Sequence, residues 1–178
     1  MDTVVSDPVR PEPDQRQALL ALYGEALPVL YGYLIRRCGS AGVAEELTSE
    51  AFLAAVGQIR RQRVTAVTLP WLIGIARHKL VDHWRRQEVE QRALALVELD
   101  DIEDHWDATL VSLDALATLA NLAPHHRGAL TLRYLDGLSV PEVADHLRRT
   151  VGATEVLLVR ARRAFRAAYE VGHTEEAP

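Results

Sequence analysis

The chain contains very little cysteine: Cys38 is the only one among 178 residues. A single cysteine excludes an internal disulfide and a thiolate zinc cluster, and it fits a reducing compartment. Aromatic residues make up only 6%, whereas Ala, Leu, Val, Arg and Glu are abundant, which favours helix over strand. No run of about 18 apolar residues is present, and the N-terminus lacks a basic start followed by an apolar segment. We therefore predict a cytoplasmic protein with neither a membrane span nor a signal peptide.

The net charge of −5 argues at first against nucleic-acid binding, but the charges are unevenly distributed. Residues 10–86 hold eleven basic and seven acidic residues, and residues 111–170 hold eight and six. Residues 87–110, in contrast, hold one basic and eight acidic residues. Because local charge decides phosphate binding, two mildly basic blocks flanking an acidic connector remain compatible with DNA binding.

The first basic block has helical periodicity. Residues 1–13 contain three prolines and no apolar period, so we expect a disordered lead-in. Asp14 is a suitable cap for a helix that stops near Gly39, and Pro28 predicts a kink or a break inside it. A second amphipathic helix is predicted over about 43–60.

A third helix is predicted to begin at Pro70, because proline is favoured in the first turn of a helix. Its apolar spacing indicates a buried face. We expect this face to consist of Trp71, Leu72, Ile75, Ala76, Leu80 and Trp84.

The second basic block ends in a helix-turn-helix pattern. A short helix is predicted at about 110–119, and another begins at Pro124. Ser139-Val-Pro-Glu142 forms a capping box that starts a further helix ending at Leu147. A tight turn at 148–150 then leads into a long final helix. Such a pair of helices can place its second helix in the DNA major groove.

Clusters of histidine and carboxylate side chains raise the alternative of a metal enzyme. The adjacent pair His125-His126 projects in directions about 100° apart on a helix, and neither it nor the pair His78/His83 is accompanied by a metal-binding signature. No glycine-rich phosphate loop is present. We therefore predict no enzymatic activity, no metal and no cofactor.

Three ordered segments resemble one protein family. Residues 44–52 (AEELTSEAF) are similar to region 2.2 of bacterial sigma factors, and residues 70–86 (PWLIGIARHKLVDHWRR) are similar to regions 2.3 and 2.4. Residues 122–147, with LRY, GLSVPEVA and a final leucine, resemble region 4. The chain thus resembles the extracytoplasmic-function (ECF) sigma factors of the sigma-70 superfamily over residues 15–86 and 111–169.

The resemblance implies an all-α fold of two small domains. Region 2 would be a three-to-four-helix bundle at 14–86, and region 4 a helix-turn-helix domain at 111–170. An acidic linker at 87–110 would join them, and 171–178 would be a tail. The implied partners are core RNA polymerase (its β′ clamp and β flap), promoter DNA and an anti-sigma factor. The alternative is a free-standing helix-turn-helix factor that acts on duplex DNA without polymerase.

The resemblance also implies three sets of site residues. Core-polymerase binding would involve Glu45, Glu46, Leu47, Glu50 and Phe52. Binding of the −10 element would involve Arg60, Arg61, Arg63, Arg77, His78, Lys79, His83, Arg85 and Arg86. Binding of the −35 element would involve Arg148, Arg149, Thr150, Ala153, Thr154, Glu155, Leu157, Arg160, Arg162 and Arg163.

Several positions depart from the family pattern. His78 replaces the usual asparagine, Glu155 and Leu157 replace a lysine and an arginine in the recognition helix, and Arg148 replaces a glycine. Glutamate accepts hydrogen bonds only from donors such as the amino group of cytosine, so −35 specificity is expected to differ. The acids between Asp100 and Asp107 are either a nucleic-acid mimic or a solvated linker. Cys38 is either a redox sensor or a packing residue, and we favour packing.

Overall fold

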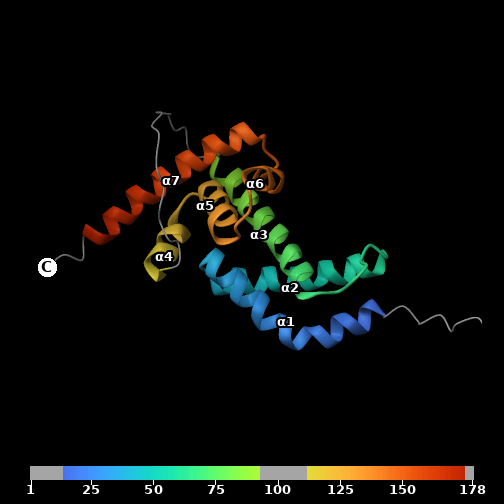
Figure 1. Cartoon of the computed structure of the whole chain (residues 1–178). Coiled ribbons are helices and arrows are strands. Elements are labelled where there is room, and N and C mark those ends of the chain that lie inside the picture. Colours follow the sequence, from blue (N-terminus) through green and yellow to red (C-terminus); the bar gives the residue numbers. More distant parts are fainter. Residues whose placement is uncertain (1–13, 93–111, 175–178) are drawn as a thin grey trace, which may run out of the picture.

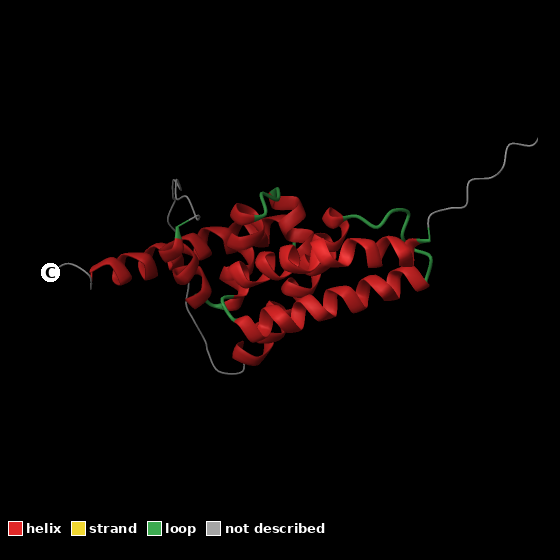
Figure 2. Cartoon of the chain, turned by 90° about the horizontal axis from the view of Figure 1, so that it is seen from below, coloured by secondary structure: helices red, strands yellow, loops and turns green. Residues whose placement is uncertain are grey.

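The computed structural model of the chain describes residues 14–92 and 112–174. Within these ranges every regular element is helical, as the composition predicts (Figures 1 and 2). The predicted lead-in, the acids between Asp100 and Asp107 and the end of the predicted tail lie outside the described residues.

Three helices form the N-terminal bundle: α1 (Gln15–Cys38), α2 (Ala41–Arg60) and α3 (Leu69–Arg92). The carboxylate of Asp14 caps α1 by accepting the backbone N–H of Arg16 at 3.0 Å. Gly39 ends α1 with a φ of 69°, a left-handed conformation that glycine adopts at little cost.

Pro28 lies inside α1 without interrupting it, and Figure 1 shows α1 bending along its length. Of the two outcomes that the sequence allowed at this proline, a kink or a break, the structure has the kink.

α1 is also the one described helix whose length and mean hydropathy, 1.5, match those of a membrane-spanning segment. In the structure it packs against α2 and α3 and buries Leu30 and Leu34 completely. A long core helix has the same composition as a membrane span, so its place in the bundle accounts for its hydropathy.

The C-terminal bundle contains α4 (Leu113–Asn121), α5 (Pro124–Leu130), the π-helical turn η1 (Thr131–Leu135), α6 (Val140–Leu147) and α7 (Val151–Thr174). The Glu142 carboxylate accepts the backbone N–H of Ser139 at 2.8 Å, as the capping-box pattern predicts. It also accepts the Ser139 hydroxyl at 2.6 Å. Arg148 adopts a left-handed φ of 54° between α6 and α7, so the predicted tight turn is present. Both long helices continue past the predicted domain boundaries, α3 to Arg92 and α7 to Thr174.

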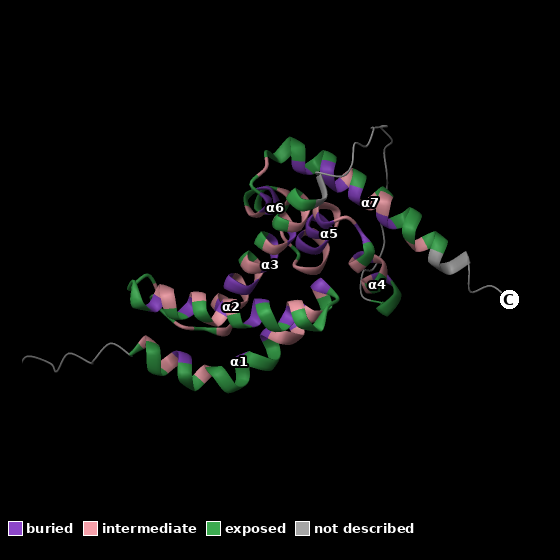
Figure 3. Ribbon diagram, turned by 180° about the vertical axis from the view of Figure 1, so that it is seen from behind, coloured by how far each residue is buried: buried purple, intermediate pink, exposed green. Residues whose placement is uncertain are grey.

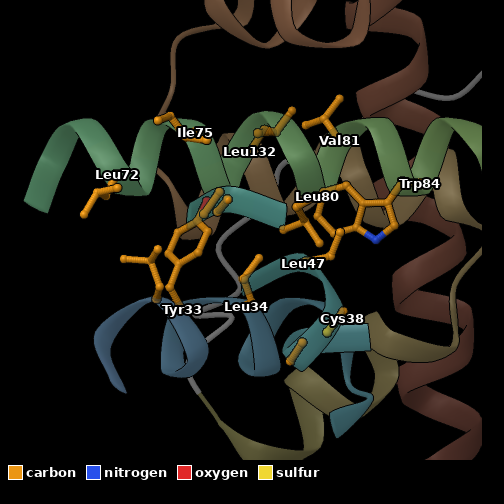
Figure 4. Close-up of a cluster of buried hydrophobic side chains, with 14 of the residues drawn as sticks. Tyr33, Leu34, Cys38, Leu47, Leu72, Ile75, Leu80, Val81, Trp84 and Leu132 are labelled. Atoms are coloured by element: carbon orange, nitrogen blue, oxygen red, sulfur yellow. The ribbon is translucent and has the colours of Figure 1, made fainter. Parts of the chain in front are cut away.

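The two bundles pack against each other, which the sequence did not predict. α3 contacts both α5 and α6, and α1 contacts α4. Trp84 of α3 is 2% exposed, and a Cβ atom at Gly128 of α5 would lie only 3.1 Å from its ring. In Figure 4, Leu132 of η1 lies among the side chains of α3. One hydrophobic cluster therefore extends through both bundles, and a second, smaller cluster that includes Leu119 and Phe165 lies within the C-terminal bundle.

The buried face of α3 follows its sequence pattern closely. Leu72, Ile75, Ala76 and Leu80 are all buried together with Trp84, as predicted. Trp71, the remaining member of the predicted face, is only half-buried.

We predict that Trp84→Ala lowers the free energy of unfolding by about 3–5 kcal/mol, because it leaves a large cavity where the bundles meet. Urea denaturation of the full chain measures this loss. Val89→Ala is the matched control, since Val89 lies on the same helix and is 71% exposed. A loss no larger for Trp84→Ala than for Val89→Ala would contradict this role of Trp84.

Candidate nucleic-acid interface

The α2 residues predicted to bind polymerase divide into exposed and buried positions. Glu45 and Glu46 are exposed, and Glu45 lines a largely apolar pocket of roughly 400 Å³ between α1 and α2. Leu47 is fully buried in the core, and Phe52 packs its ring 4.9 Å from that of Tyr23. Glu50 forms an ion pair with Lys79 of α3 at 3.1 Å. Its carboxylate therefore partly neutralises a lysine of the predicted −10 set.

The predicted −10 residues form two exposed groups. Arg60, Arg61 and Arg63 surround the loop between α2 and α3, and all three are exposed. Arg85 and Arg86 lie near the C-terminal end of α3, where Arg86 is exposed and Arg85 is 3.5 Å from the carboxylate of Asp82. Both groups present guanidinium side chains to solvent, where phosphates can reach them.

The remaining −10 residues on α3 each contact another part of the protein or are partly buried, although His78 is also exposed to solvent. Arg77 forms an ion pair with Asp136 of the C-terminal bundle at 3.0 Å. His78 lies with its ring centroid 4.8 Å from that of His146 on α6. His83 is half-buried, and burial followed by the charge of Arg86 lowers its pKa.

The predicted −35 residues at the start of α7 include both exposed and buried positions. The Thr150 hydroxyl accepts the backbone N–H of Ala153 at 3.2 Å and so caps α7. Thr154 is fully buried and donates its hydroxyl to the Thr150 carbonyl at 3.0 Å, while Leu157 is 6% exposed. Of the predicted recognition residues on this first turn and a half, Ala153 and Glu155 are therefore the exposed ones. Figure 3 shows that buried and exposed positions both occur along α7.

The arginines of the predicted −35 set also differ in their surroundings. Arg148, Arg160 and Arg163 are exposed. Arg162 donates to the Tyr134 hydroxyl at 3.2 Å, and Arg149 forms an ion pair with Glu88 of α3 at 2.9 Å.

Asp136 joins the bundles electrostatically. Its side chain is 2% exposed. One oxygen accepts from Arg37 at 2.6 and 3.1 Å, and the other accepts from Arg77 at 3.0 Å and from the Tyr33 hydroxyl at 2.8 Å. Burial, followed by the negative charge of Asp136, raises the pKa of Tyr33. The acid in the Leu-Asp-Gly turn carried no signal of a partner about a hundred residues earlier in the chain.

No group of three histidine, cysteine or carboxylate side chains among residues 14–92 and 112–174 is placed to hold a metal ion. The rings of His125 and His126 lie 4.1 Å apart. Burial, together with the charges of His125 and Arg160, lowers the pKa of His126 to about 4. Cys38 is buried, and burial raises the pKa of its thiol, which disfavours the reactive thiolate.

Comparison with known proteins identifies the two bundles. Residues 22–89 match the family model of sigma-70 region 2, and residues 112–165 match that of sigma-70 region 4. The chain is 32% identical to the ECF RNA polymerase sigma factor BldN of Streptomyces coelicolor over 85% of its own length and 60% of BldN. It is also 32% identical to the ECF sigma factor SigF of Caulobacter vibrioides, over 82% of its length and 84% of SigF.

The fold has a solved counterpart in the sigma factor RpoE of Bartonella quintana, determined with the anti-sigma factor NepR. The TM-score is 0.52 at 22% identity, over 89% of this chain and 98% of that one.

A region 2 bundle followed by a region 4 bundle defines a transcription-initiation protein rather than an enzyme. The chain belongs to the ECF group of RNA polymerase sigma factors. It is a non-catalytic subunit that directs RNA polymerase to promoters through regions 2 and 4.

The contact between His146 and His78 places a titratable histidine where the two bundles meet. Burial, then His78 and Arg77 of α3, lower the pKa of His146, whereas Asp136 and Asp145 act in the opposite direction. The Nδ1 atom of His146 is buried without a hydrogen-bond partner among the described residues. A proton on His146 is therefore bound less readily in the folded state than in the unfolded state.

We predict that His146 lowers stability in acid. The stability of the folded chain is unaffected by this histidine above the pKa of His146 in the unfolded chain, about 6.5. Stability is lost as the pH falls from there toward the lower pKa of His146 in the folded chain, because the unfolded chain then binds the proton more readily. Urea midpoints of the wild type and His146→Asn between pH 8 and pH 5 measure the effect. The wild type should lose more stability than the variant over this interval; equal losses would contradict the prediction.

Proposed function

We propose that region 2 of this sigma factor, at 14–86, binds the β′ clamp of core polymerase and the melted −10 strand. Region 4, at 111–170, binds the −35 element and the β flap. The main support is the concentration of exposed arginines on α3, its preceding loop and α7 in a chain whose net charge is −5. The alternative of a free-standing helix-turn-helix factor does not account for the presence of region 2.

Polymerase binding is assigned to the exposed part of α2. Glu45 and Glu46 present negative charge beside the apolar pocket lined by Leu27, Pro28 and Tyr31. An acidic rim around an apolar surface suits a basic helical partner, because complementary charge guides docking and apolar contact stabilises it. Leu47 supports this surface from the core.

Promoter opening is assigned to the loop at 61–68 and the exposed side of α3. Extruding a base from the duplex costs a few kcal/mol, which contacts to the base and to neighbouring phosphates must offset. Arg60, Arg61 and Arg63 are positioned around the loop for such contacts, and Arg86 extends the basic surface along α3.

Readout of the −35 element is assigned to Ala153 and Glu155, with Arg148, Arg160 and Arg163 on phosphates. Phosphate contacts set the register of the helix in the groove, and base contacts provide specificity. Thr154 and Leu157 hold α7 in place from its buried side.

An anti-sigma factor is a further proposed partner, supported by the solved complex of the RpoE sigma factor with NepR. The cytoplasm, with association to the nucleoid in the holoenzyme, is the proposed location, because RNA polymerase and its promoters are found there.

We predict that Arg86→Ala weakens promoter binding by the reconstituted holoenzyme and removes about 0.9 from the slope of log affinity against log salt. This slope loss corresponds to one phosphate contact. Arg36→Ala is the control, because Arg36 is an exposed arginine of α1 outside the proposed interface. An unchanged slope for Arg86→Ala would remove this arginine from the DNA interface.

We predict that Glu155→Gln changes the preferred −35 bases, since each specific base contact discriminates by about 1–3 kcal/mol. Transcription from a promoter library with a randomised −35 element measures the preference, and affinity for core polymerase should stay the same. Asp114→Asn, which neutralises an exposed acid on α4, is the control. A change in polymerase affinity without a change in base preference would assign Glu155 to the polymerase interface.

A further inference from the structure

The loop between α2 and α3, at 61–68, is held by backbone hydrogen bonds at both of its ends. At the end of α2, the backbone N–H of Arg63 donates to the Gln58 carbonyl at 3.1 Å. At the start of α3, the Thr68 carbonyl accepts the backbone N–H of Leu72 at 3.1 Å. These bonds fix where the loop begins and ends, but they do not fix the course of its middle.

The middle of the loop is tied to the first turn of α1. The side-chain amide of Gln15 donates to the Thr65 carbonyl at 3.2 Å, across fifty positions of the chain. The start of α1 lies beside this loop in Figure 1. Val64 and Val67 are half-buried and pack against the core. Two apolar anchors therefore hold the loop from inside, and the bond from Gln15 holds the backbone between them.

The exposed side of the loop carries its polar and basic residues. Arg61, Gln62 and Arg63 are exposed, and Gln62 has a φ of 53°. A left-handed backbone is uncommon for a residue with a side chain, and it persists only where the surrounding structure holds it. The loop thus presents its arginines to solvent while its valines face the core.

The first turn of α1 and the loop form two sides of one pocket of roughly 740 Å³. Asp14, Gln15 and Arg16 line one side, and the end of α2 and the loop line the other. This turn lies before residue 22, where the match to the sigma-70 region 2 model begins. None of the site residues predicted from the sequence lies on it.

We propose that Gln15 is a positioning residue for promoter opening, which holds the loop through the Thr65 carbonyl while Arg61 and Arg63 contact the melted −10 strand. A segment that is already ordered loses less conformational entropy when it binds. Gln15 therefore favours opening through the loop and not through a DNA contact of its own. The inference rests on the proposed role of the loop in promoter opening, and the experiments below separate the two.

Limited cleavage by an arginine-specific protease measures how firmly the loop is held, because Arg61 and Arg63 lie in it and cleavage requires local opening. Gln15→Met keeps the length of the side chain and removes its donor, so cleavage in the loop should become about threefold faster through the loss of one hydrogen bond. Gln17→Met is the matched control, since Gln17 is an exposed glutamine of the same helix. Gln15→Lys retains a donor of similar reach and should restore slow cleavage. Mass spectrometry assigns the cleavage sites.

Promoter opening is measured with the full chain reconstituted with core polymerase, on a promoter that the wild-type holoenzyme selects from a random-sequence pool. A fluorescent adenine analogue in the −10 element reports the unstacking of its bases. Gln15→Met should slow opening about threefold relative to Gln17→Met, because the same hydrogen bond is lost. Binding to the duplex promoter before opening and the urea midpoint of the chain should stay unchanged. A merely structural role would move the urea midpoint instead.

The outcomes separate the positioning role from the role of the loop. If Gln15→Met and Gln17→Met are cleaved at the same rate, Gln15 does not hold the loop and the inference is overturned. It is overturned as well if Arg63→Ala slows opening but Gln15→Met does not, since the loop then acts without this support. If Gln15→Met raises cleavage of the loop and neither it nor Arg63→Ala slows opening, the hold on the loop stands and the proposed role of the loop in promoter opening fails.

Discussion

The carboxylate of Asp136 is the interaction on which the arrangement of the two regions depends. It receives hydrogen bonds from two cations and a tyrosine that belong to α1 and α3, about a hundred and about sixty residues earlier in the chain. Because the group is buried, its charge is tolerated only with these partners in place. Hydrophobic packing of Trp84 against Gly128 brings the regions together, and Asp136 fixes their register. Burial of apolar side chains, which is non-directional, thus favours contact between the regions, and the directional ion pairs determine how the regions are oriented.

The same interface connects folding to function through charge. A sigma factor directs RNA polymerase to promoters, and the exposed arginines are the groups that we propose to contact the promoter DNA. In a chain with a net charge of −5, those arginines are close enough to acids to be neutralised internally. Arg149 of region 4 pairs with Glu88 of region 2 across this interface, whereas Lys79 pairs with Glu50 inside region 2. Both cations therefore already have a carboxylate partner. Arg61 and Arg63 of the 61–68 loop and Arg160 of α7 are exposed to solvent.

Local features were predictable from the sequence because local chemistry determines them. The caps at Asp14 and Ser139, the stop at Gly39 and the buried stripe of α3 follow from hydrogen bonding and helical periodicity within a few residues. The packing of region 2 against region 4 was not predictable, since it depends on a glycine, an aspartate and a tryptophan that are far apart in sequence. The sequence pattern also could not separate the exposed positions of the recognition helix from its buried ones, which requires knowledge of what α7 packs against.

The departures from the family pattern consequently have unequal effects. Leu157 replaces an arginine at a buried position, so this change strengthens the packing of α7 rather than altering its exposed face. Glu155 replaces a lysine at an exposed position. A carboxylate there would repel phosphates and would accept hydrogen bonds only from donors such as the amino groups of bases. His78 places its ring against His146 at the contact between the regions. Of the three changes, Glu155 is the exposed one on α7, which is why −35 readout is proposed for it, and His78 is the one that lies where the two regions meet.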